Sequence, residues 1–360
     1  MEKLPTVLLA EGAFADDGMS KTAYGLLRYA PETVVAVIDS GHTGSDAYSV
    51  SGLGRGIPVV ADLAAALKFA PRRLVIGVAP AGGALPTEWR IQLILALEKG
   101  LEVVSGLHAI LGEDKELAEA AARGTGKITD LRLAPDNLEV ATAKAQKVKA
   151  RVVLTMGTDC NAGKMTTALE LVQLARRRGI ATSFCATGQT GIAIAGTGIA
   201  VDHVVSDFTA GAAERLVLEA FERENPDLIV VEGQGALAQP TYSGVTLSMM
   251  HGCLPDVMVL CHRATQTKVD HVNWPMPPLS DHVALCEETM RLVKPAKVAA
   301  VSLHTRGLSE SEAIRAVENA SRHTGLPATD PVRFGAEVLL QALEPLSEKV
   351  PLYSGPDARQ

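Results

Sequence analysis

The 360-residue sequence lacks several patterns that assign a chain to a common class of metal or disulfide protein. Its five cysteines are odd in number and form no Cys-x-x-Cys pair, which argues against a disulfide framework and against a zinc ribbon. The nine histidines show no His-x-x-x-His or similar spacing. We therefore expect no transition-metal site.

Long apolar runs and long basic runs are missing as well. No stretch approaches the roughly 20 apolar residues of a membrane span. The first residues, Met-Glu-Lys-Leu-Pro, lack the basic and apolar regions of a signal peptide. The formal net charge is −7, and Arg176–Arg178 is the only basic run. We expect a cytoplasmic protein whose partner is neither a membrane nor a nucleic acid.

What is present predicts an α/β protein of about two domains. Hydrophobic residues make up 47% of the chain, and short apolar runs alternate with helical patterns, as in parallel sheets covered on both faces. We predict a Rossmann-like domain over residues 1–140 and a P-loop domain over residues 150–360. Strands are expected near Thr6–Ala10, Val34–Ile38, Pro58–Val60, Leu74–Val78, Glu102–Val104, Arg151–Met156, Thr182–Ala186, Leu228–Val231, Asp256–Leu260 and Lys297–Ser302. Helices are expected at Ile91–Lys99, Met165–Arg178, Ala210–Glu224 and Ser309–Thr324.

The most informative stretch is Gly157–Thr167, which reads Gly-Thr-Asp-Cys-Asn-Ala-Gly-Lys-Met-Thr-Thr. It lies between an expected strand and an expected helix, which is the layout of a phosphate-binding P-loop. Backbone N–H groups and a helix N-terminus then face an anion, and Lys164 adds a positive charge.

Two details depart from the usual P-loop. Five residues instead of four separate Gly157 from Gly163, and Met165 stands where a Ser or Thr normally ligates magnesium. Thr166 follows one step later. The motif predicts phosphate binding, but it weakens the case for ATP hydrolysis.

Acidic and polar residues follow two later strands. Glu232, within Glu-Gly-Gln-Gly, ends the expected strand Leu228–Val231 and is a candidate general base, or alternatively a turn cap. Gln189 lies in the glycine-rich stretch that follows Thr182–Ala186, which is either a ligand loop or a plain loop. Asp207 is either an N-cap or an acid directed at the site.

Basic residues that could receive a substrate carboxylate are Arg263, Lys268 and Arg90, although solvated surface charge is the favoured interpretation of Arg263 and Lys268. Asp270-His271 pairs an acid with a base, but neighbours on an extended chain point to opposite faces. In the N-terminal part, Val37–Gly44 and Gly77–Gly83 are turns rich in glycine after expected strands. No Gly-x-Gly-x-x-Gly is present, so a dinucleotide site is only weakly indicated.

Taken together, these motifs resemble known proteins. Gly157-Thr158-Asp159 before Gly163-Lys164 is similar to the P-loop of dethiobiotin synthetase. A fuller resemblance covers nearly the whole chain, to a P-loop family catalogued as a domain of unknown function and typified by D-glutamate N-acetyltransferase. The segments that carry it are Gly157–Thr167, Ala186–Gly191, Asp207–Glu214, Val231–Gly235, Tyr242–Leu247 and Leu260–His262.

The resemblance implies an N-acetyltransferase that moves acetyl from acetyl-CoA to the amine of D-glutamate or a related acid. Its catalytic residues would be Glu232, Gln234 and Asp207, and its substrate-binding residues Arg263, Lys268, Gln239 and Tyr242. The cofactor-binding residues would be Gly157, Thr158, Asp159, Asn161, Ala162, Gly163, Lys164, Met165, Thr166, Thr167 and Gln189. A homo-oligomer is expected.

Two segments depart from the family pattern, and Thr265–Pro278 is one of them. After Glu-Gly-Gln-Gly the family reads Ser-Leu-x-His-Pro, whereas this chain has Ala236-Leu237-Ala238-Gln239-Pro240. The difference leaves the acceptor open. Two alternatives also stay open: a ligase or kinase that uses ATP with Mg, held by Thr166 and Glu232 or Asp207, and a nucleotide-binding regulator.

Overall fold

The computed structural model describes residues 3–78 and 85–344, and it divides into two compact units. The first unit consists of residues 1–134 together with 188–200, and the second of residues 135–187 together with 201–360. Each unit contains its own six-stranded sheet, and every strand pairing in both sheets is parallel. The predicted α/β class with parallel sheets is confirmed.

In the first unit the strand order is β3-β2-β1-β4-β5-β6, which is the order of a Rossmann-like sheet. The strands are β1 (Thr6–Leu9), β2 (Val34–Ile38), β3 (Val59–Val60), β4 (Arg73–Ile76), β5 (Glu102–Ser105) and β6 (Lys127–Asp130). The helices are α1 (Lys21–Tyr29), α2 (Ala47–Ser51), α3 (Leu63–Ala66), α4 (Thr87–Glu98), α5 (Lys115–Gly124) and α7 (Gln189–Ala195).

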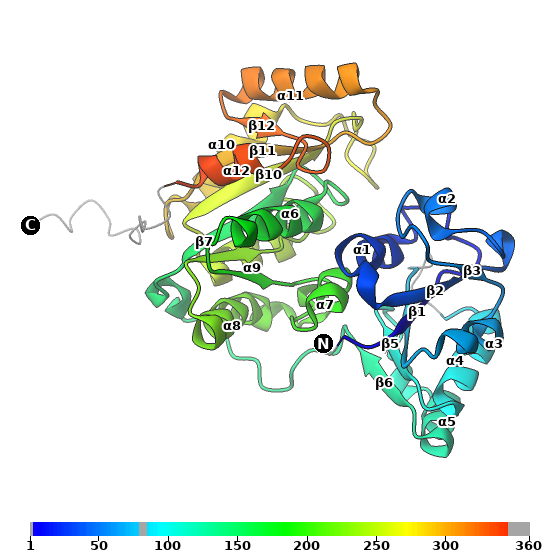
Figure 1. Cartoon of the computed structure of the whole chain (residues 1–360). Helices are drawn as coiled ribbons and strands as arrows, with labels where there is room; N and C mark the ends of the chain where they lie inside the picture. The colour runs from blue at the N-terminus through cyan, green and yellow to red at the C-terminus, as the bar shows by residue number, and fades with distance from the viewer. Residues whose placement is uncertain (1–2, 79–84, 345–360) are drawn as a thin grey trace, which may run out of the picture. The chain divides into compact units, whose positions relative to one another are not determined.

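In the second unit the order is β12-β11-β10-β7-β9-β8, so the P-loop strand β7 lies between β10 and β9. Figure 1 labels β7, β10, β11 and β12 of this sheet. The strands are β7 (Arg151–Gly157), β8 (Thr182–Cys185), β9 (Leu228–Val231), β10 (Val257–Arg263), β11 (Lys297–His304) and β12 (Ala328–Thr329). The helices are α6 (Lys164–Arg177), α8 (Ser206–Glu224), α9 (Ser243–Cys253), α10 (Leu279–Met290), α11 (Glu310–Thr324) and α12 (Glu337–Ala342).

The central strands are buried on both faces, which is why they read as continuous apolar runs in the sequence. All four residues of β1 and of β9 are buried, as are six of the seven residues of β7. The two strands that the sequence analysis missed, β6 and β12, are edge strands. Strand β6, Lys-Ile-Thr-Asp, has no buried residue, and β12 is two residues long, so neither leaves an apolar run in the sequence.

The stretch Gly188–Ala200 contains α7 and the irregular residues that follow it, and it belongs to the first unit although β8 precedes it in the second. Helix α7 ends at Gly196, whose φ of 80° favours glycine. The hydroxyl groups of Thr190 and Thr22 are 2.7 Å apart, which ties α7 to α1. The predicted ranges 1–140 and 150–360 assign this stretch to the P-loop domain, whereas its contacts group it with the Rossmann-like unit.

Candidate functional site

The P-loop geometry begins where β7 ends at Gly157 and α6 starts at Lys164. Gly163 is the N-cap of α6, with a φ of 94°, and Asn161 has a φ of 57°. Among the described residues no side chain caps this helix, so its first N–H groups are left for an anion. The helix dipole adds a partial positive charge at the same place.

Lys164 directs a buried ammonium group into this loop. Its side chain is 8% exposed, and Nζ donates a hydrogen bond to the carbonyl oxygen of Asp159 at 2.8 Å. Burial lowers the pKa of Lys164, while nearby Cys160, Cys261, Asp159 and Glu232 oppose that shift. A Cβ at Gly157 would lie 2.6 Å from Nζ, so the lysine needs glycine at that position.

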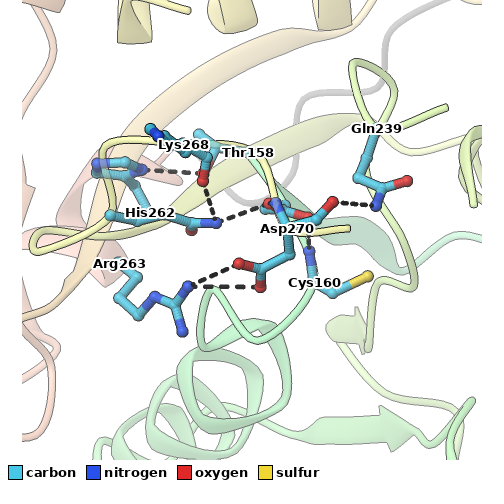
Figure 2. Close-up of polar contacts among 9 residues, drawn as sticks. Thr158, Cys160, Gln239, His262, Arg263, Lys268 and Asp270 are labelled. Carbon is cyan, nitrogen blue, oxygen red and sulfur yellow. Dashed lines mark hydrogen bonds and ion pairs between the residues drawn. The ribbon is translucent and has the colours of Figure 1, made fainter. Parts of the chain in front are cut away.

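Two predicted cofactor residues of the loop turn their side chains into the protein. Thr158 Oγ1 is 2.9 Å from Nδ1 of His262. The fully buried carboxylate of Asp159 accepts from the backbone N–H of Cys160 at 2.6 Å, from Gln266 Nε2 at 2.7 Å and from the backbone N–H of Asp270 at 2.7 Å. The side chains of Thr158 and Asp159 thus connect the P-loop to β10 and to the segment that follows it (Figure 2).

His262 is uncharged at neutral pH. Burial, followed by the charges of His282 and Arg263, lowers its pKa to about 4. The contact with Thr158 therefore joins two neutral groups.

One of the two threonines in the first turn of α6 is hydrogen-bonded to other side chains of the protein. Thr167 Oγ1 is 2.7 Å from the hydroxyl of Ser302 and also contacts the Cys261 thiol at 3.4 Å. Met165 and Thr166 are half-buried, and Ala162 is buried. Thr166 is thus the threonine of this turn whose hydroxyl is not held by Ser302.

Glu232 follows β9, which pairs with the P-loop strand. Its side chain is 4% exposed, and Oε2 accepts a hydrogen bond from the backbone N–H of Thr187 at 3.0 Å. It lies close enough to Lys164 for the two charges to interact. The structure therefore brings the predicted base and the phosphate-site lysine together.

The residues after Glu232 are held close to neighbouring backbone. Gln234 Nε2 donates to Thr187 Oγ1 at 3.1 Å, and the backbone N–H of Gly233 donates to Thr155 Oγ1 at 3.0 Å. A Cβ at Gly233 would collide with the Thr155 carbonyl oxygen. The backbone N–H of Gly233 is therefore already engaged.

Arg263, Gln239 and Tyr242, three of the predicted substrate residues, gather around Asp270 and its neighbour His271. Arg263 Nη2 lies 3.2 and 3.4 Å from the carboxylate oxygens of Asp270. Gln239 Nε2 donates to the Asp270 carbonyl oxygen at 3.1 Å, and the Tyr242 ring meets the His271 ring edge-on at 6.1 Å. Lys268 lies exposed on the same segment. Figure 2 shows Arg263 and Gln239 on either side of Asp270.

Three other candidates lie elsewhere. Asp207 is an exposed residue in the first turn of α8, whose N-cap is Val205, so the N-cap prediction is wrong. Gln189 begins α7 in the first unit. Arg90, also in the first unit, is bound to Asp114 at 2.7 Å and to Glu116 at 3.0 Å.

The acidic residue in the glycine turn after β2 is already engaged. The Asp39 carboxylate after β2 accepts from the backbone N–H of Gly12 at 3.1 Å and lies 2.6 Å from His42 Nδ1. Most of the turn at Gly77–Gly83 lies outside the described residues. Within residues 3–78 and 85–344, no group of three His, Cys, Asp or Glu side chains is arranged to hold a metal ion.

Sequence reasoning missed Gln266, a loop residue that is 9% exposed and donates to Asp159. No local signal marks it, because the contact joins positions 107 residues apart. None of the helices in the described residues is both long enough and apolar enough to cross a membrane.

Comparison with known proteins places these features in one family. The model of the DUF1611 C-terminal domain, described as a P-loop domain of unknown function, matches residues 139–340. The model of its N-terminal, Rossmann-like domain matches residues 40–134. A DUF1611 family protein from Anabaena variabilis, known from a crystal structure, has 39% sequence identity to this chain. The two structures match with a TM-score of 0.89 over 94% of this chain and 99% of that one.

Two curated relatives carry an enzyme name. A D-glutamate N-acetyltransferase of Tritonibacter scottomollicae is 37% identical over 341 residues, which span 93% of this chain and 97% of that protein. A D-glutamate N-acetyltransferase of a Pseudoalteromonas species is 34% identical over 280 residues, or 77% and 83% of the two chains.

Proposed function

This chain belongs to the DUF1611 family, and on that premise we propose that it is an N-acetyltransferase that moves acetyl from acetyl-CoA to the amine of D-glutamate or a related acidic amino acid. The names of the two relatives support acetyl transfer to an amine. The observation that supports acetyl-CoA as the acetyl donor is the buried ammonium group of Lys164 at the uncapped start of α6. Met165 stands there in place of the usual magnesium ligand.

The residues of the P-loop fit the phosphates of coenzyme A. Lys164 and the first N–H groups of α6 supply a cation and several donors without a metal. Met165 carries no oxygen that could ligate Mg, and the hydroxyl of Thr167 is bound to Ser302, so Thr166 is the residue of this turn through which Mg would have to bind. When bound, acetyl-CoA would supply an acetyl group already activated as a thioester.

The remaining tasks fall to the chain's own side chains. An amine is largely protonated at neutral pH and must lose a proton before it attacks a carbonyl. Glu232, beside Lys164 and buried, is the candidate base. The backbone N–H groups of Gln234 and Gly235 are the candidate donors for the negative charge that acyl transfer develops on oxygen.

The acceptor's carboxylates need cationic partners, and Arg263 and Lys268 lie on one segment that Asp159 ties to the P-loop. Gln239 replaces the histidine of the family pattern and is buried against Asp270 and the start of α9. The exchange therefore changes a residue in contact with Asp270, and we expect it to bear on which acid is accepted.

Two measurements test the proposal. Titration calorimetry with acetyl-CoA in the presence of a chelator should show binding, and mass spectrometry with D-glutamate should show a product heavier by one acetyl group. Magnesium-dependent ATP binding with phosphate release would contradict the proposal and favour a ligase or kinase. Binding without turnover across D- and L-amino acids would favour a regulator.

A further inference from the structure

Asp270 is held firmly through its main chain. Its N–H donates to Asp159 Oδ2 at 2.7 Å, and its carbonyl oxygen accepts from Gln239 Nε2 at 3.1 Å. Asp159 and Gln239 are both fully buried, one in the P-loop and the other after β9. The backbone at Asp270 is therefore fixed from two sides (Figure 2).

Its carboxylate, in contrast, is held loosely. The contacts with Arg263 measure 3.2 and 3.4 Å and come from a single nitrogen, Nη2. By comparison, Arg90 donates to the Asp114 carboxylate from two nitrogens, Nη1 at 3.0 Å and Nη2 at 2.7 Å. The side chains of Arg263 and Asp270 are 31% and 32% exposed, and an ion pair this open contributes little to stability.

The loose pair leaves binding capacity on both partners. In the part of the chain that the structure describes, the hydrogen bonds of the Arg263 guanidinium come from Nη2, so Nε and Nη1 keep their donors. The Asp270 carboxylate likewise keeps lone pairs beyond those facing Nη2. Arg263 thus offers a site for an anion and Asp270 an adjacent site for a cation. Asp270 is bound directly to Asp159 of the P-loop.

We propose that the Arg263–Asp270 pair is the receptor for the head group of a zwitterionic amino acid, with Arg263 binding the carboxylate and Asp270 binding the ammonium group. This inference rests on the proposed function and adds Asp270 to the acceptor site. A ligand that carries both charges satisfies both side chains. A carboxylic acid without an amine meets Arg263 but is repelled by Asp270, so the pair selects amino acids over plain acids.

The test uses three variants of the full chain and titration calorimetry with D-glutamate, L-glutamate and glutarate, which lacks the amine. Asp270→Asn keeps the main-chain N–H and carbonyl that Asp159 and Gln239 hold. It should weaken binding of the preferred glutamate by about tenfold or more. Glutarate should bind unchanged or more tightly, since the repelling charge is gone. Arg263→Gln should weaken both ligands.

Glu288→Gln is the matched control, because Glu288 forms an exposed ion pair with Arg291 at 2.8 Å on α10 and should change neither ligand. Acetyl-CoA affinity should be the same in all variants. Equal effects of Asp270→Asn on glutamate and glutarate, or no effect, would overturn the inference, as would absence of glutamate binding by the unaltered protein. An altered glutamate affinity without acetylation by the unaltered protein would refute the proposed function alone.

Discussion

At the scale of single residues, Lys164 shows how the fold prepares a charge for a ligand. A buried ammonium costs free energy unless it is paired, and its hydrogen bond goes to a backbone carbonyl of the same loop rather than to a carboxylate. A phosphate offers Lys164 a full opposite charge, and binding then recovers part of the cost of burial.

We expect Lys164→Ala to weaken acetyl-CoA binding by about 1.5–3 kcal/mol, because a phosphate loses a charge-assisted partner. This corresponds to a dissociation constant roughly 10- to 150-fold higher, measured by titration calorimetry. Lys297→Ala serves as the control, since that lysine is exposed and paired with Glu287. An unchanged affinity in Lys164→Ala would mean that the loop is structural.

Glu232→Gln tests the base. The amide keeps an oxygen that can accept from the Thr187 N–H, so the fold should be retained, while turnover should fall by roughly 10²-fold or more. Acetyl-CoA affinity should stay close to that of the unaltered protein. The matched variant is Glu214→Gln, another buried glutamate that accepts from backbone N–H groups on the same unit. Parallel losses of turnover and affinity in Glu232→Gln would argue against a base.

At the scale of elements, the site depends on how closely three segments approach one another. The P-loop, the turn after β9 and the segment after β10 are joined by hydrogen bonds that Asp159 accepts and that Gln239 and Gln266 donate. The turn after β9 also approaches the P-loop strand so closely that Gly233 has no room for a side chain. Glycine there is a packing requirement.

Gly233→Ala should therefore destabilise the protein by about 1–3 kcal/mol, since its Cβ would press on the Thr155 carbonyl and lie 3.2 Å from Lys164 Cδ. Urea unfolding measures the effect. Gly244→Ala, on α9, is the control because nothing lies within 4 Å of its Cβ, and it should be neutral or slightly stabilising. Equal free energies of unfolding for the two variants would show that the turn after β9 can shift to accommodate a side chain without loss of stability.

At the scale of the whole molecule, the chain does not divide into two consecutive halves. After β8 it enters the first unit for residues 188–200 and then returns to the second. Helix α7 contributes Thr190 to a buried contact with Thr22, and the Gln189 side chain packs against Gly106. Stability of the Rossmann-like unit thus depends on residues that are distant in sequence.

A double-mutant cycle of Thr22→Val and Thr190→Val should reveal a coupling of about 0.5–1.5 kcal/mol in thermal or urea unfolding, as expected for a hydrogen bond. Thr22→Val combined with Thr129→Val should be additive, because Thr129 bonds instead to Glu102 in the same unit. Additivity in both cycles would place α7 outside the folded first unit in solution.

The sequence by itself determined the α/β class, the central strands and the position of the P-loop, because these depend on local apolar runs and on glycines next to Lys164. It also placed Glu232 after a buried strand, and a parallel sheet then brings that residue near the loop. Only the tertiary structure decided that Asp159 binds Gln266 and Asp270, and that Asp270 faces Arg263. The Asp159 contacts, like the membership of α7 in the first unit, join residues far apart along the chain, whereas Arg263 and Asp270 lie seven positions apart and meet because of how the segment after β10 is packed. No spacing or periodicity encodes them, because they arise when the strand ends and loops are packed together.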